Sequence, residues 1–354
     1  MEGSSLQRTT LFLLILLLFC QSACADTVHI LWADLSDPFC AQTRLALEDA
    51  FSTSGISLVH ENAALSQWAQ IDLAEAAVAA APSIICIQTC EYAPLSAARA
   101  VMEAPIAAGI PVIFFGRQIG PSVDGIRDFL SQYDNVWYVH HDQADIGKSQ
   151  GTAAGAYLAA HYAACDLNGD GYISAVVLQG DPYDSDASDR ALYAIQEADR
   201  ILTTSGYPAL FGPDSDHPAV YADPECMWSA EFGRNTLSEL LTTFSPSSGQ
   251  MIELVLCGND DMANGAVNAL THVGYNSDLP GAPAIPVYGV DGTLLAKELI
   301  SSHRMAGTVA RSPEHLAHTL AALCMEMLGK ESNIPEGIRV DGHLLFPAYD
   351  VLQE

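Results

Sequence analysis

The sequence alternates short apolar segments with longer amphipathic ones over most of its length. Segment 28–35 has the near-continuous apolar character of a buried strand, and a helical pattern follows it to about residue 54. Strands of this kind separated by helices are typical of a parallel sheet that is covered on both faces. After a less regular stretch at 133–141 the alternation begins again. The strands are predicted at 28–35, 56–61, 83–89, 111–117, 173–180, 208–211, 252–257 and 286–291, and the helices of the second series at 144–163, 186–205, 225–244 and 261–273.

Two series of strands and helices of similar size predict an α/β protein with two similar Rossmann-like lobes. A chain of 354 residues is long enough for both, because a domain takes ~100–200 residues. Ligands of open parallel sheets bind beyond the carboxyl ends of the strands, so a site is expected in the cleft between two facing lobes. Candidate residues at predicted strand ends are Gly116, Arg117, those of segment 181–186, Asn259, Asp260 and Asp291.

Acidic residues greatly outnumber basic ones. The chain carries 43 Asp and Glu against 14 Lys and Arg, which gives a net charge of −29. A surface of this sign repels phosphate backbones and anionic lipid headgroups, so nucleic-acid binding is not expected. With 49% hydrophobic and 16% charged residues, the composition is that of a globular protein with sizeable cores.

An apolar run at 11–20 follows Arg8 and precedes an Ala-x-Ala pattern at 23–25. The run is too short to span a bilayer, which takes ~20 residues, and the pattern is typical of a secretory signal peptide. We predict that 1–25 is removed and that Asp26 begins the mature, exported chain.

The cysteines leave two questions open. Cys24 would begin a lipid-anchored chain, an alternative that Gln21 disfavours because lipoproteins usually carry an aliphatic residue there. Of the seven later cysteines, Cys86 and Cys90 are the closest pair in sequence, and no CxxC motif suggests zinc. Most are expected to be small core residues, and the disulfide connectivity of an exported chain cannot be read from the sequence. The seven are Cys40, Cys86, Cys90, Cys165, Cys226, Cys257 and Cys324.

Segment 166–174, DLNGDGYIS, has the pattern of a calcium loop. Oxygen side chains at positions 1, 3, 5 and 9, a glycine at 6 and a carbonyl at 7 wrap a calcium ion. Val177 stands where an EF-hand has its last carboxylate, so a distant residue must supply it. Glu253 is the best donor, because it is the only charge at the start of a strand expected to neighbour 173–180. The expected ligands of a structural Ca²⁺ are Asp166, Asn168, Asp170, Tyr172 through its carbonyl, Ser174 and Glu253, and the alternative is a solvated turn without metal.

Several motifs together resemble one known family. The signal peptide, the two lobes, the calcium loop followed by AVVLQGDPYDSDASDR, and the segments IELVLCGNDDMANGAV, YGVD and AGTV are similar to the periplasmic glucose/galactose-binding proteins of bacterial sugar ABC transporters. The likeness covers essentially the whole mature chain. It implies the type 1 fold of periplasmic binding proteins, a monosaccharide ligand of the galactose or glucose type, structural Ca²⁺, a periplasmic location and a membrane permease as partner.

The same resemblance assigns the sugar contacts. In that family two aromatic rings stack on the faces of a pyranose, while carboxylates, amides and arginines bind its hydroxyls. Phe39 and Trp228 match the two rings. The hydrogen-bonding residues that match are Asp37, Asp186, Arg190, Asn259 and Asp291.

Three rim positions depart from the family pattern. Gly116 and Arg311 each stand where the family has Asn, and Asp184 stands where it has His. Asp184 and Arg311 are therefore expected ligand contacts with altered chemistry. The added arginine suits a sugar with extra oxygen or negative charge, or it neutralises Asp184. Arg190 could likewise pair with Asp186 on one helix face at i, i+4.

Closure of two lobes on a ligand needs hinges where the chain crosses between them. They are expected near 139–142, 310–312 and 346–348. The N-terminal lobe would comprise 26–139 and 313–346, and the C-terminal lobe, which carries the calcium loop, 142–310 and 348–354.

Two other classes of function are considered. An enzyme is not expected, because no GxSxG motif or phosphate loop occurs. A sensory protein that presents a sugar to a chemoreceptor or sensor kinase stays open as an alternative, and in either role a monomer is expected. The histidines at His140, His141, His315 and His318 lack carboxylates or cysteines at metal spacing and are interpreted as core or surface residues.

Overall fold

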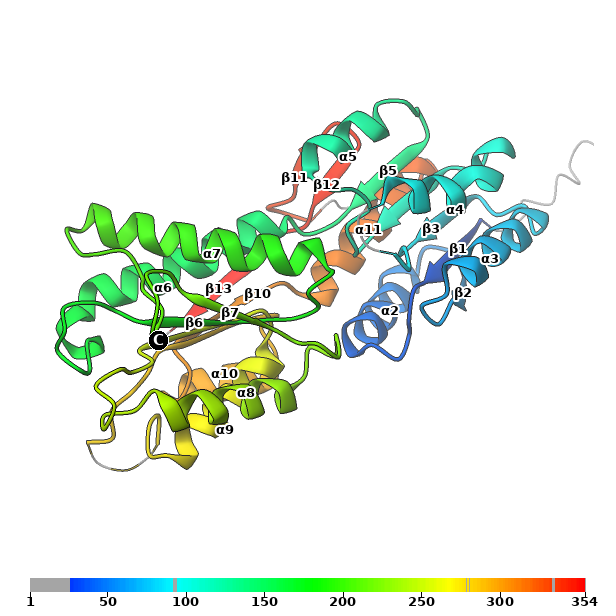
Figure 1. Ribbon diagram of the computed structural model, residues 1–354. Coiled ribbons are helices and arrows are strands. Elements are labelled where there is room, and N and C mark those ends of the chain that lie inside the picture. The colour runs from blue at the N-terminus through cyan, green and yellow to red at the C-terminus, as the bar shows by residue number, and fades with distance from the viewer. Residues whose placement is uncertain (1–25, 92–93, 278, 280, 333–334, 354) are drawn as a thin grey trace, which may run out of the picture.

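The computed structural model describes residues 26–353 except 92–93, 278, 280 and 333–334. Figure 1 shows two lobes, with the blue and cyan elements gathered in one and the green and yellow elements in the other. We call them the N-lobe and the C-lobe. The predicted signal peptide at 1–25, with Cys24, lies outside the described residues. Among the described residues, no helix combines the length and apolarity needed to cross a bilayer.

The N-lobe is built on a seven-stranded sheet. Its strands, in sheet order, are β11 (Arg339–Asp341), β12 (Leu344–Phe346), β5 (Val136–Val139), β4 (Val112–Phe115), β3 (Ile84–Ile87), β1 (Thr27–Trp32) and β2 (Ser57–Asn62). All neighbours pair in parallel except β11 with β12. Every residue of β3 and β4 is buried, as expected where helices cover both faces of a sheet.

In the part of the chain that the structure describes, five helices cover the N-lobe sheet, and each face has its own apolar core. One core joins Val28 and Ile30 of β1 to Leu47 and Leu320 of the helices on that face. The other joins Leu31 to the helices on the opposite face. The helices are α2 (Pro38–Phe51) and α11 (Pro313–Met327) on the first face, and α3 (Gln67–Ala79), α4 (Leu95–Ala107) and α5 (Val123–Leu130) on the second.

The C-lobe repeats this plan with a six-stranded sheet. Its strands, in sheet order, are β13 (Asp350–Gln353), β10 (Gly307–Ala310), β9 (Val287–Val290), β8 (Leu254–Cys257), β6 (Ala175–Gln179) and β7 (Ala219–Ala222). The pairs are parallel except β10 with β13. Helices α6 (Gln143–Cys165) and α7 (Ser185–Thr204) pack on one face, and α8 (Ala230–Thr243), α9 (Asp260–His272) and α10 (Leu294–Ser301) pack on the other.

Small residues bring α6 and α7 into backbone contact. Gly147, Gly151 and Gly155 recur every fourth residue along α6, so they lie on one face of the helix. A Cβ on Gly147 would overlap the carbonyl oxygen of Arg190, and one on Gly151 would overlap that of Ala194. This packing fixes the first turns of α7 beside the start of α6.

The chain passes between the two sheets three times, after β5, after β10 and after β12. These passages coincide with the predicted hinges near 139–142, 310–312 and 346–348. Figure 1 shows the consequence at the C-terminal end of the chain, where the red strands β11 and β12 belong to the N-lobe and the red strand β13 belongs to the C-lobe. The two facing parallel α/β lobes confirm the predicted fold.

Two predicted elements differ from the structure. Segment 208–211 is not a strand, because Phe211 makes only an isolated bridge to Ser174, and the strand beside β6 is instead Ala219–Ala222. The helix predicted at 225–244 begins at Ala230. Cys226 and Trp228 have φ of +58° and +54°, which a right-handed helix does not allow.

Candidate ligand site between the lobes

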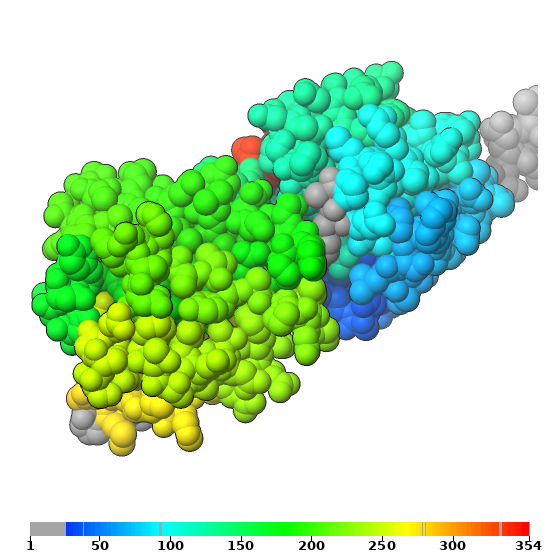
Figure 2. Space-filling view, viewed as in Figure 1, coloured from blue at the N-terminus to red at the C-terminus, as the bar shows by residue number. Residues whose placement is uncertain are grey.

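A cavity of about 620 Å³ lies between the lobes. Its walls include residues that directly follow β4, β9 and β10, and its volume is within the range of small-molecule sites. In the space-filling view the green C-lobe and the blue and cyan N-lobe meet along one seam (Figure 2). All nine predicted ligand-binding residues line the cavity, namely Asp37, Phe39, Asp184, Asp186, Arg190, Trp228, Asn259, Asp291 and Arg311.

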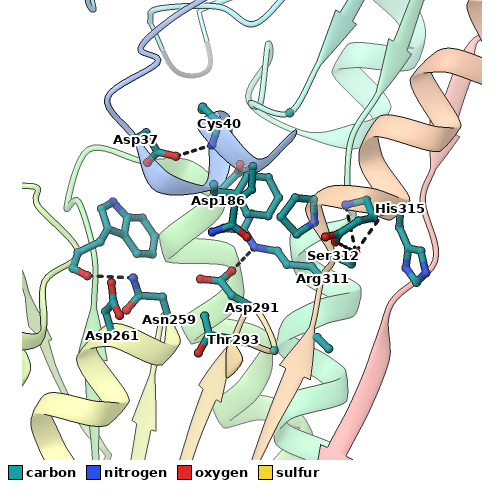
Figure 3. A pocket seen from close by; sticks show the side chains of 18 of the residues that line it. Asp37, Cys40, Asp186, Asn259, Asp261, Asp291, Thr293, Arg311, Ser312 and His315 are labelled. Carbon is teal, nitrogen blue, oxygen red and sulfur yellow. Dashed lines mark hydrogen bonds and ion pairs between the residues drawn. The ribbon is translucent and has the colours of Figure 1, made fainter. Parts of the chain in front are cut away.

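Three of these nine side chains cap helices whose N-termini face the cavity. Asp37 caps α2 by accepting the backbone N–H of Cys40 at 2.8 Å, a bond that Figure 3 shows, and Asn259 caps α9 by accepting that of Met262 at 2.9 Å. Asp184 caps α7 in the same way. An N-cap uses one acceptor of its side chain and is held in one orientation by that bond. The remaining polar groups of these side chains are thus fixed at the edge of the cavity.

Trp228 is held against the C-lobe backbone in an unusual conformation. Its φ of +54° is rare for a bulky side chain, and such strain concentrates at functional sites. The indole occupies the space that a Cβ would take on Gly180, so glycine is required there. Asn259 donates its side-chain N–H to the Trp228 carbonyl at 2.9 Å, which ties the two cavity residues together.

Arg190 lies next to this indole, with its guanidinium carbon 5.4 Å from the centre of the Trp228 ring. The side chain is only 2% exposed. It donates to the side-chain oxygen of Gln143 at 2.7 and 3.1 Å and to the carbonyl of Gly258. Burial lowers the pKa of Arg190 to about 10, so the side chain is still a cation at neutral pH. Arg190 therefore bonds to neutral groups, and the predicted alternative that it pairs with Asp186 is not what the structure shows.

Asp186 has a different partner, His140, whose Nε2 lies 3.1 Å from its carboxylate. Both side chains are buried. The sequence predicts His140 to be an ordinary core or surface residue, and the structure places it against a predicted ligand contact. Ligand sites lie beyond the carboxyl ends of parallel strands, and His140 directly follows β5. This strand-end rule therefore makes His140 a candidate site residue from the sequence alone.

Asp184 is buried beside Asp186, which raises the cost of ionising it. Burial and the neighbouring charge of Asp186 raise the pKa of Asp184 to about 8. The carboxyl group is therefore mostly protonated at neutral pH and can donate a hydrogen bond to a ligand oxygen. Asp184 thus offers the cavity a donor as well as an acceptor.

Arg311 pairs with Asp291, with Nε 2.6 Å from the carboxylate oxygen, as Figure 3 shows. Its guanidinium carbon also lies 4.7 Å from the centre of the Phe39 ring, which is a cation–π distance. Asp291 has φ of +120°, a strained value for a residue with a side chain. The alternative that Arg311 neutralises Asp184 is therefore not what the structure shows.

The N-lobe wall is completed by Gly116, Gln88 and Arg117. Gly116 has φ of +70°, and a Cβ there would lie 3.3 Å from the Gln88 amide nitrogen, so a larger residue is disfavoured. Arg117 donates to the carbonyl of Cys90 at 3.2 Å.

The predicted calcium loop lies at the far end of the C-lobe sheet from this cavity, between α6 and β6. Asp166 accepts the backbone N–H groups of Gly169, Asp170 and Gly171 at 2.7 to 3.1 Å. This is the closed turn that the motif predicts.

Glu253 reaches this loop although it is distant in sequence. Its side chain is 1% exposed and accepts the backbone N–H of Leu167 at 2.7 Å and of Ser174 at 3.0 Å. The neighbour predicted for its strand is also present, because Leu254 pairs with Ala175. Burial raises the pKa of Glu253, and the charge of Asp166 raises it further.

The side chains of the predicted calcium ligands do not all point toward one common centre. Ser174 donates its hydroxyl to the carbonyl of Met251, and the Asn168 amide donates to Asp170 at 2.8 Å. In the described ranges, no group of three or more His, Cys, Asp or Glu is spaced to hold a metal ion. Oxygen donors of the type that calcium prefers are present, while their side chains bond to one another and to the backbone.

Comparison with known proteins identifies the family of this two-lobed chain. Residues 28–332 match the family model of the periplasmic binding protein domain. The chain belongs to this family. The resemblance found in the sequence is thus confirmed at the level of the family, whose match covers both lobes and the cavity between them.

Relatives of this periplasmic binding protein include the D-galactose/methyl-galactoside binding periplasmic protein MglB of Haemophilus influenzae, which is 28% identical over 262 residues, or 74% of this chain and 69% of the relative. Among solved structures, a periplasmic solute binding protein of an ABC transporter from Actinobacillus succinogenes, with bound D-allose, has a TM-score of 0.65 and 19% identity over 93% of this chain and 97% of its own. An ABC transporter solute binding protein from Clostridium phytofermentans, with bound β-D-glucose, has a TM-score of 0.65 and 17% identity over 93% of this chain and 94% of its own. At such identities the two structures bear on the fold alone.

Proposed function

We propose that the protein is exported to the periplasm, captures a monosaccharide between its two lobes and delivers it to the membrane permease of an ABC transporter. The family is one of binding proteins, and the curated relative is named for a galactose-type sugar. The observation that carries the proposal is the cavity, because residues of both lobes form its walls. A ligand held by both lobes favours the closed form, which a membrane partner can distinguish from the open one.

The chemistry of the walls favours a neutral sugar. Phe39 and Trp228 come from different lobes and offer apolar ring faces for the C–H groups of a sugar. Asp37 and Asn259 offer fixed polar groups, and Asp184 adds a donor. Because each sugar hydroxyl both donates and accepts, a wall that contains carboxylates, amides and arginines satisfies it in both directions.

Isothermal titration calorimetry of the mature chain with D-galactose, D-glucose, D-xylose and a uronic acid tests the proposal. We expect one neutral hexose to bind with 1:1 stoichiometry and micromolar or tighter affinity. Absence of heat with every monosaccharide would overturn the assignment to this ligand class.

A second ligand class is an acidic sugar. Arg190 and Arg311 both line the cavity, and Arg190 bonds to the neutral groups of Gln143 and Gly258. A carboxylate on the ligand would supply the opposite charge that these neutral groups do not. Binding of the uronic acid alone in the same titration favours this candidate.

The partner protein that recognises the closed form can belong to one of two classes. A permease and a chemoreceptor or sensor kinase would each recognise a closed pair of lobes. Reconstitution with the permease and ATPase encoded nearest to this protein separates them, because transport predicts sugar-stimulated ATP hydrolysis that depends on the binding protein. Stimulation of a sensor kinase alone would favour the sensory alternative.

We also propose that segment 166–174 and Glu253 hold a structural Ca²⁺. The turn is already closed by backbone bonds to Asp166, and the buried Glu253 carboxylate lies against it. A divalent cation would compensate the charges of Asp166, Asp170 and Glu253, which lie in one region of an acidic protein. Rotation of the Ser174 and Asn168 side chains from their present bonds would complete the oxygen set.

A further inference from the structure

Two buried cysteines lie in contact within the N-lobe. Cys86, on β3, and Cys324, on α11, have their sulfur atoms 3.8 Å apart, and both residues are 0% exposed. A disulfide bond needs the sulfurs at ~2.05 Å. The remaining gap is less than ~2 Å, so formation of the bond requires side-chain rotation or a small shift of α11 by that amount.

The pair is distinct among the cysteines. No other two of the seven cysteines in the described residues make a thiol–thiol hydrogen bond. Cys40, for example, is bonded instead to the Gln88 side chain at 3.1 Å. Sequence spacing gave no hint of the pair, because 238 positions separate its members.

The position of the pair gives a cross-link a structural effect. The N-lobe is assembled from two stretches of chain, and β3 belongs to the first while α11 belongs to the one that returns after the C-lobe. The N-terminal end of α11 borders the cavity through Ser312 and His315. A bond between Cys86 and Cys324 would hold this wall of the cavity to the sheet covalently.

We propose that Cys86 and Cys324 are oxidised to a disulfide bond in the mature protein, by thiol–disulfide exchange with a disulfide oxidant. One cysteine thiolate attacks a sulfur of the oxidant, which forms a mixed disulfide and releases one thiol. The second thiolate then attacks the cysteine sulfur of the mixed disulfide and displaces the other thiol. Two electrons and the two thiol protons pass from the cysteines to the oxidant, which leaves as two thiols.

Burial decides when the reaction occurs. Both sulfurs are inaccessible in the folded N-lobe, and desolvation raises the pKa of the Cys86 thiol, so few thiolates form there. The exchange therefore takes place during folding, before α11 closes over the sheet. An exported chain folds in an oxidising compartment, where such oxidants are present.

The test is refolding of the reduced mature chain with oxidised glutathione, followed by iodoacetamide in denaturant and peptide mapping. We expect two of the seven cysteines to be protected, and a linked peptide, lighter than its two parts by two hydrogens, to contain Cys86 and Cys324. Thermal unfolding should then occur several degrees higher than for the reduced chain, because cross-linking a long loop restricts the unfolded state. Folded, reduced protein treated in the same way should react far more slowly.

Two variants distinguish the loss of the Cys86–Cys324 bond from a general effect of cysteine substitution on folding. Cys86→Ser should abolish the linked peptide, and Cys257→Ser, at a buried position of β8 in the C-lobe, should leave it unchanged. Mapping of the wild-type chain does not depend on either variant folding. Alkylation of all seven cysteines after oxidative refolding, or a linked peptide that contains another pair, would overturn the proposal. The proposal rests on the proposed export of the chain but not on its ligand, so failure of sugar binding would leave these outcomes unchanged.

Discussion

His140 and Asp186 form a buried pair, 3.1 Å apart, that joins the two lobes beside the cavity, which Asp186 lines. The backbone N–H of His140 donates to Leu345 in the N-lobe sheet at 3.1 Å, while Asp186 is in the first turn of α7 in the C-lobe. The pair therefore connects the orientation of a predicted ligand contact to the first crossing between the lobes. A change at His140 is expected to reach the ligand through Asp186.

Replacement of His140 by Ala should weaken sugar binding. Without the imidazole, the buried Asp186 side chain loses the partner that lies 3.1 Å away, and an unsatisfied buried group costs ~1–3 kcal/mol. We expect the dissociation constant from calorimetry to rise ~10-fold or more. The exposed His217→Ala is the control and should bind as wild type does. Equal affinities of the two variants would show that His140 does not position Asp186 for the ligand.

Replacement of Trp228 by Ala should remove most of the affinity. Truncation of a central aromatic anchor costs ~2 kcal/mol or more, which corresponds to a ~30-fold or larger rise in dissociation constant. Trp68→Ala is a matched control, because that indole is 81% exposed on α3. Intrinsic fluorescence during titration gives a second reading, since a sugar stacked on Trp228 should change the emission of the wild type. A Trp228→Ala variant with unchanged affinity would exclude the sandwich.

Arg311→Asn distinguishes the two ligand classes. If the ligand is neutral, the Asn side chain keeps a hydrogen-bond donor near Asp291, and we expect the hexose affinity to stay within ~10-fold of wild type. Binding of a uronic acid should be lost, because a charge-assisted bond to the guanidinium is removed. Arg234→Asn, at an exposed position of α8, is the control for net charge. Stronger binding of the acid by Arg311→Asn would contradict this role for the arginine.

The periodic pattern of the sequence was sufficient to predict the two lobes. The strand-end rule also placed Asp291, Asn259, Asp184 and Asp186 at the cavity, since residues that follow parallel strands must lie at one edge of the sheet. Phe39 and Trp228 required the family resemblance, because no local pattern distinguishes a ligand-stacking ring from a core ring. Trp228 in particular lies within the helix predicted at 225–244, but its positive φ is incompatible with a right-handed helix.

Contacts between distant segments could not be predicted. Gln143 meets Arg190 only because glycines let α6 and α7 approach closely, and Arg311 meets Asp291 only because β9 and β10 are neighbours. Segment 208–211 is predicted as a strand because it is apolar, whereas the strand that pairs with β6 is Ala219–Ala222. In each case tertiary packing decided between options that local sequence left equal.

Calcium should stabilise the C-lobe if segment 166–174 binds it. We expect chelator to lower the unfolding temperature of the mature chain by several degrees and added Ca²⁺ to restore it, because a ligand that binds only the folded state stabilises it by mass action. Glu253→Gln should abolish this response, while the exposed Glu239→Gln should retain it. An unfolding temperature of the wild type that is indifferent to both chelator and Ca²⁺ would refute the site, whatever the basal stability of the variants.

The pKa of Asp184 predicts a change of stability with pH that an asparagine would remove. The folded chain retains the proton of Asp184 up to about pH 8, because burial and Asp186 disfavour its charge, whereas the unfolded chain releases it near the ordinary value of 3.8. The folded state therefore binds more protons in this window, so the contribution of Asp184 to stability is complete below about 3.8 and is lost as pH rises toward 8. Asn does not titrate, so the unfolding temperature of Asp184→Asn should fall less between mildly acidic and mildly alkaline pH than that of the wild type. The exposed Asp214→Asn should follow the wild-type curve, and parallel curves for all three proteins would show that Asp184 ionises in the folded state as it does in water.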